Sequence, residues 1–108
     1  MYSYGHYCIP VTEKPADADF VPLLGVYVTD CAKHPLSFEF LYVPEENKTF
    51  PQELRTRNHI AFNVDNFDEI LASGRVLLQF ICPYDNVSRV AFVEREGTIV
   101  EIKETTFA

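Results

Sequence analysis

Apolar and polar residues alternate along most of the chain with the two-residue period of β-strands. Residues 12–24 contain two prolines and predict an extended connection, whereas the charged residues 45–58 predict an exposed loop. The pattern indicates an α+β fold with a curved, mostly antiparallel sheet of seven or eight strands. The strands that we expect cover residues 6–11, 25–29, 36–43, 58–64, 75–81, 89–94 and 98–104.

One segment, residues 65–74, has the periodicity of a helix, because Phe67, Ile70 and Leu71 fall on one face. Asp65 or Asn66 is suited to cap its start, with an acidic residue three positions later as in a capping box. A glycine at position 74 is suited to a left-handed residue at the end of the helix. The second half therefore predicts the order strand, helix, strand, strand, strand.

The first half resembles a shortened copy of the second, with an extended connection in place of the helix. Each half opens with a strand that begins near a histidine, His6 or His59. Each half closes with a strand that carries a glutamate between apolar residues, Glu39 or Glu101. The separation from His to Glu is 33 residues in the first half and 42 in the second, and the missing helix accounts for the difference. We expect one domain, 1–108, with modules at about 4–50 and 58–106.

These four polar residues are the candidates for chemistry. Alternation places His59 on the strand face opposite the helix layer and Glu101 on the same side. A carboxylate between apolar strand neighbours is costly to bury without a partner. Two glutamates and two imidazoles form a mixed N/O set that suits a divalent ion, with Zn, Ni, Co, Mn and Fe(II) all compatible. A single His or Glu would be an ordinary polar residue on a solvent-exposed sheet face. The interpretation as a metal site therefore depends on finding one His and one Glu at corresponding places in both halves.

Charge and cysteine content narrow the class of protein. The formal charge of -7 argues against nucleic acid and anionic membranes as partners, and no apolar run approaches a bilayer span of about 20 residues. The N-terminal residues do not have the pattern of a signal peptide. Three scattered cysteines indicate reduced thiols in a cytoplasmic protein. Cys31 and His34 have a Cys-x-x-His spacing, but without a second pair they do not predict a zinc site.

Two stretches of the second half are distinctive: His-Ile-Ala-Phe-Asn-Val-Asp at 59–65 and Arg-Val-Ala-Phe-Val-Glu-Arg-Glu-Gly-Thr-Ile-Val-Glu-Ile at 89–102. They resemble the second module of the vicinal oxygen chelate superfamily, which includes glyoxalases, bleomycin resistance proteins, extradiol dioxygenases and methylmalonyl-CoA epimerase. In the first half, Gly-His-Tyr at 5–7 and Phe-Glu-Phe at 38–40 hold the expected places. The resemblance implies paired βαβββ modules in a half-open sheet around a metal, the helix of the first module being degenerate. It also implies four metal ligands, at His6, Glu39, His59 and Glu101.

Two functions remain open from the sequence. In the first, the protein is a metal-dependent lyase, isomerase or epimerase whose small substrate has vicinal oxygens. Glu101 or Glu39 then takes a proton from the carbon next to a carbonyl. In the second, the protein binds or sequesters a small molecule without chemistry, and some of its six Tyr and nine Phe residues line the pocket.

We also expect a homodimer. The first module lacks a helix to cover its sheet, which leaves apolar surface to be buried. That surface would lie around Val26, Val28, Phe38 and Phe40.

Overall fold

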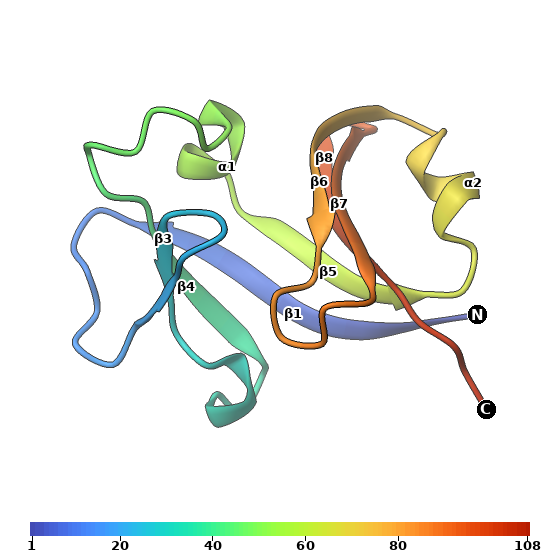
Figure 1. Cartoon of the computed structure of the whole chain (residues 1–108), viewed down its shortest axis with the longest axis horizontal. Helices are drawn as coiled ribbons and strands as arrows, with labels where there is room; N and C mark the ends of the chain where they lie inside the picture. Colours follow the sequence, from blue (N-terminus) through green and yellow to red (C-terminus); the bar gives the residue numbers. More distant parts are fainter. The chain divides into compact units, whose positions relative to one another are not determined.

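Eight strands and three short helical segments make up the chain in a computed structural model that describes residues 1–108 (Figure 1). All seven expected strands are present with limits within two residues, except that β1 begins four residues earlier than expected. The predicted α+β class is confirmed. The elements are β1 (Tyr2–Val11), β2 (Asp19–Val21), β3 (Val26–Val28), η1 (Cys31–Lys33), β4 (Phe38–Tyr42), α1 (Gln52–Thr56), β5 (His59–Val64), α2 (Phe67–Leu71), β6 (Arg75–Ile81), β7 (Arg89–Arg95) and β8 (Thr98–Glu104).

The chain divides into two compact units. Unit 1 comprises Met1–Gly5 and His59–Ala108, and unit 2 comprises His6–Asn58. Strand β1 therefore contributes its first residues to unit 1 and the remainder to unit 2.

Unit 1 is a mixed sheet with one helix packed on it. Its strand order is β5-β8-β7-β6, with β5 and β8 parallel and the other pairs antiparallel. Helix α2 lies beside these strands in Figure 1 and packs on β7 and β8. The expected inward face is confirmed, since Phe62 and Val64 of β5 and Val100 and Ile102 of β8 all pack there. The buried residues of this core are Val64, Phe67, Ala91, Val93 and Ile102.

Unit 2 repeats the strand order of unit 1. Its order is β1-β4-β3-β2, with β1 and β4 parallel and the other pairs antiparallel. In both units the first strand therefore pairs with the last, followed by the third and the second. No helix lies between β1 and β2, which confirms the degenerate first module. Strand β2 was not expected within 12–24, because three residues are too few for a period-two pattern to appear.

Helix α2 is shorter than the predicted 65–74, and its predicted C-terminal signal is wrong. Asn66 is the N-cap, one of the two residues predicted, but its side chain makes no bond to the backbone, and its amide instead donates to Glu69 Oε2 at 3.3 Å. Gly74 does not have a positive φ. A glycine is needed at position 74 because the backbone passes close to β7, where a Cβ would lie 2.4 Å from the carbonyl oxygen of Glu94.

The charged segment 45–58 was expected to be a loop, yet it contains helix α1. The helix has five residues and a single buried side chain, Leu54, which is fully enclosed. One apolar anchor in five residues gives no measurable helical periodicity. The preceding turn is organised by Asn47, whose amide donates to the carbonyl oxygens of Leu24 and Gly25, both at 2.9 Å.

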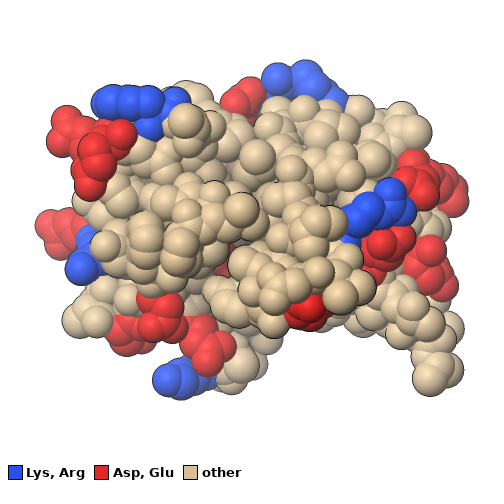
Figure 2. Space-filling model, viewed as in Figure 1, with Lys and Arg blue, Asp and Glu red and all other residues tan.

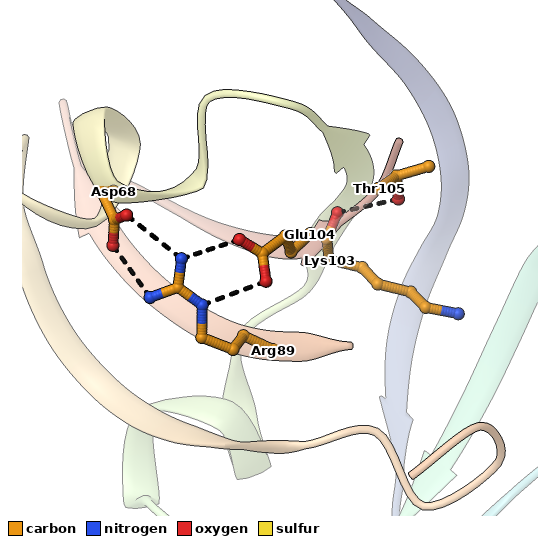
Figure 3. A network of polar contacts seen from close by, with 5 residues as sticks. All are labelled: Asp68, Arg89, Lys103, Glu104 and Thr105. Carbon is orange, nitrogen blue, oxygen red and sulfur yellow. Dashed lines mark hydrogen bonds and ion pairs between the residues drawn. The ribbon is translucent and has the colours of Figure 1, made fainter. Parts of the chain in front are cut away.

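A cluster of ion pairs connects α2 to the sheet of unit 1 (Figure 3). The guanidinium of Arg89 on β7 donates two bonds to Asp68 of α2 and two to Glu104 of β8, at 2.7–3.1 Å. The same group lies over the ring of Phe67, 4.4 Å from its centroid. Hydrogen bonds from Arg89 lower the pKa values of Asp68 and Glu104 below their ordinary values of 3.8 and 4.5.

This cluster predicts how stability depends on pH. A carboxylate whose pKa is lower in the folded state stabilises it above the ordinary pKa, and the contribution is lost as pH falls through the folded value. Urea unfolding is therefore expected to show declining stability of unit 1 below about pH 4, and Arg89→Met should flatten the decline. Arg75→Met, which removes the same charge from an arginine that is 61% exposed, is the control. Equal acid sensitivity of Arg89→Met and wild type would contradict the assignment.

Charged side chains on the face shown in Figure 2 do not gather in one dominant patch. Figure 2 shows acidic side chains scattered over the visible face, with no cluster of Lys and Arg. Val26 was expected to contribute to exposed apolar surface, but it is 1% exposed. Phe38, another residue of that expected surface, is contacted by the ring of His34, which stacks on it. No helix has the length or the apolar content to cross a bilayer.

Candidate metal centre

In unit 1, one histidine and one glutamate from parallel neighbouring strands face each other. His59 is the first residue of β5, and Glu101 is in the middle of β8. His59 Nε2 lies 3.0 Å from Glu101 Oε1, which is hydrogen-bonding distance. The His59 side chain is 2% exposed and that of Glu101 is 16% exposed. The predicted placement of both side chains on one face is correct within this unit.

Aromatic and aliphatic side chains surround this pair. Phe92 of β7 is the register partner of Glu101, and its ring meets the His59 imidazole edge-on at a centroid distance of 4.9 Å. Phe80 of β6 contacts Phe92 at 6.1 Å, and Ile99 is fully buried. Low-polarity walls of this kind strengthen electrostatic interactions between the groups that they enclose.

In unit 2, the corresponding residues also form a pair. His6 Nε2 of β1 lies 3.7 Å from Glu39 Oε2 of β4, and the two side chains are 16% and 18% exposed. The distance exceeds a hydrogen bond but is within the range of an ion pair. Cys8, the register partner of Glu39, is fully buried.

The two pairs occupy the same register in their units. In unit 1, Glu101 is the partner of Ala61, two residues after His59. In unit 2, Glu39 is the partner of Cys8, two residues after His6. Both pairs also bridge the parallel first and last strands of the unit. The correspondence noted in the sequence is therefore present in the strand pairing of each unit.

The donor atoms fit a divalent transition metal. Imidazole nitrogen and carboxylate oxygen bind Zn²⁺ at about 2.0–2.2 Å, so two ligands on one ion stand about 3–3.6 Å apart. The separation of 3.0 Å between His59 and Glu101 lies in this range, and the 3.7 Å of His6 and Glu39 is slightly longer. Each pair could supply one nitrogen and one oxygen donor to such an ion.

The remaining candidates from the sequence have local roles. His34 accepts a hydrogen bond at Nδ1 from the backbone N–H of Leu36 at 3.1 Å, and its ring stacks on Phe38 at 4.7 Å. Cys8 and Cys82 are buried, as expected for small apolar side chains. Asn63, Phe92 and Lys103 also share the sheet face of His59 and Glu101 but were not expected near a site. The two-residue period of strands is the signal that could have identified Asn63 and Lys103.

The fold defines a class of α+β proteins in which two units repeat one strand order. No protein-family model matches the sequence, and no curated protein matches it. The structure is similar to the crystal structure of a hypothetical protein, BH1468 from Bacillus halodurans C-125, with a TM-score of 0.63. The two sequences are 18% identical, and the match covers 99% of this chain and 96% of the other. This similarity shows a shared fold.

Proposed function

We propose that this protein is a metal-dependent lyase, isomerase or epimerase of the vicinal oxygen chelate type. Its substrate would be a small molecule with vicinal oxygens, such as an α-hydroxycarbonyl. The observation that carries the proposal is the identical register of the His–Glu pairs in two units of identical strand order. A repeat of this kind is expected when both halves of a chain contribute ligands of the same type.

In this proposal His6, Glu39, His59 and Glu101 bind one divalent cation. When bound, the ion would act as a Lewis acid on the substrate carbonyl. His59 is suited to a ligand role, because its ring is 2% exposed and is positioned by Phe92 and Glu101. The two glutamates balance the charge of the ion, and the two imidazoles remain neutral.

Glu101 is the proposed general base. Its carboxylate accepts the proton from the carbon next to the carbonyl. The resulting carboxylic acid then returns a proton to the same carbon in an epimerase, or to the former carbonyl carbon in an isomerase, where the hydroxyl proton also passes to the former carbonyl oxygen. No oxidant or further reactant is needed, and the carboxylic acid exchanges its proton with solvent before the return. The carboxylate is partly accessible, at 16% exposure, while Phe92 and Ile99 limit water around it. Glu39 holds the equivalent position in unit 2 and is the alternative base.

A specific observation supports the second candidate function, a binding protein without chemistry. The 3.0 Å contact between His59 and Glu101 is already a hydrogen bond, so the pair is satisfied without an ion. In that case the aromatic side chains near the pair hold a ligand by stacking and burial.

Proton exchange distinguishes the two functions. Hydroxyacetone, dihydroxyacetone and lactate are incubated with the protein in D₂O, with Zn²⁺, Ni²⁺, Co²⁺, Mn²⁺ or Fe²⁺, and loss of the C–H signal is followed by NMR. The enzyme proposal predicts that at least one metal accelerates exchange and that a chelator abolishes the acceleration. Saturable ligand binding without any exchange would favour the binding protein and contradict the enzyme.

A further inference from the structure

An open pocket of about 480 Å³ lies in unit 1 at the end of the sheet face that carries Glu101. Lys103 follows Glu101 by two residues in β8, so its side chain points to the same side. Asn63 of β5 is its register partner and also lines the pocket. Figure 3 shows Lys103 extending away from the cluster of Arg89 and Glu104. Glu101 does not line the pocket, but it lies two residues from Lys103 along β8.

Lys103 is the only lysine of unit 1, and it is less tightly engaged than the arginines of that unit. Arg75, Arg89 and Arg95 each donate hydrogen bonds of 3.2 Å or less to Glu94, to Asp68 and Glu104, and to Ser73, respectively. The ammonium of Lys103 lies 3.6 Å from Asp85 Oδ2, and both side chains are about two-fifths exposed. An ammonium has three donors, and this ion pair is longer than a hydrogen bond, so Lys103 can also bind a ligand in the pocket.

The carboxylates around the pocket are occupied by other donors. Asp85 accepts bonds from the Ser88 hydroxyl at 2.6 Å and from the backbone N–H groups of Val87 and Ser88 at 2.9 Å. Glu104 is held by Arg89. Lys103 thus remains available to a ligand. The negative charges of Asp85 and Glu104 repel a doubly charged phosphate more strongly than a singly charged carboxylate.

We propose that Lys103 and Asn63 bind a carboxylate of the substrate, at a distance from the reacting carbon. Two residues along a strand span about 6.6 Å, which matches a short carbon chain between the two ends. The substrate class is then a small hydroxy or oxo acid that carries a further, distal carboxylate. The position of the reacting carbon rests on the proposed function, whereas carboxylate binding at Lys103 does not.

Binding is tested with protein passed over a chelating resin, so that the result does not depend on a metal. Glutarate and its neutral analogue glutaramide are titrated and followed by amide NMR shifts. Glutarate is expected to shift Asn63, Ser88 and Lys103, and glutaramide is not. Lys103→Met should weaken glutarate binding about tenfold, and Lys103→Arg should retain it, because a charge-assisted bond is lost only in the first. Lys48→Met, which removes the same charge at an exposed site, is the control.

Two outcomes would overturn the inference. One is equal glutarate binding by Lys103→Met and wild type, and the other is tighter binding of inorganic phosphate than of glutarate. Absence of metal-dependent proton exchange would contradict the proposed function but would leave this result intact. If the proposed function and the carboxylate site are both correct, Lys103→Met should raise KM for 2-hydroxyglutarate more than it lowers kcat. KM for 2-hydroxyvalerate, which lacks the distal carboxylate, should not change.

Discussion

Glu101→Gln is expected to lower turnover by about 10²–10⁴-fold while the protein retains its metal. The amide oxygen of glutamine can still ligate a cation, but an amide cannot accept the substrate proton. The substitution preserves the size of a side chain that is 16% exposed, so the sheet of unit 1 should be unaffected. Metal content and kcat are measured on the same preparation.

His59→Ala is expected to give the opposite result, with the metal lost first. The substitution deletes a proposed metal ligand and leaves a space beside Phe92. His34→Ala is the matched control, since His34 accepts a local backbone bond and has no glutamate partner in the proposed site.

Full activity of Glu101→Gln with metal retained would remove Glu101 as the base and leave Glu39 as the candidate.

Phe67→Ala is expected to lower the free energy of unfolding by about 3–5 kcal/mol, as for other large buried aromatic residues. Phe67 is 2% exposed and belongs to the core that joins α2 to the sheet. Its ring also supports the guanidinium of Arg89, so truncation weakens both contacts. The measurement is the urea midpoint followed by far-UV circular dichroism.

Leu36→Ala provides the control, because Leu36 is 62% exposed and should change stability by no more than about 0.5 kcal/mol. A loss below about 1 kcal/mol for Phe67→Ala would show that α2 contributes little to unit 1. The sheet would then be stabilised mainly by the pairing of β5 to β8.

The longer strands were predictable because their alternation has a physical cause. In β5 and β8 one face packs under α2 and the other carries His59 and Glu101, so apolar and polar positions must alternate. Strand β2 and helix α1 escaped prediction, since three and five residues give no period. Gly74 was misread because sequence alone does not distinguish a left-handed turn from close contact with Glu94.

The pairs of the candidate site were predicted from spacing and resemblance, and strand register then supplied what spacing lacked. The separations of 33 and 42 residues do not reveal that Glu39 and Glu101 stand opposite equivalent positions. The pocket beside Lys103 depends on the loop that places Asp85 and Ser88 near β8, and this placement is a tertiary feature.

The most direct test of the proposed metal site is the metal content of the wild-type protein, purified without a histidine tag and analysed by inductively coupled plasma mass spectrometry. We expect about one transition-metal ion per chain. We also expect marked loss of that ion in His59→Ala and in His6→Ala, and retention in His34→Ala. A wild-type protein that contains no metal and takes up none of the five candidate cations on titration would contradict the metal site, and with it the proposed enzyme.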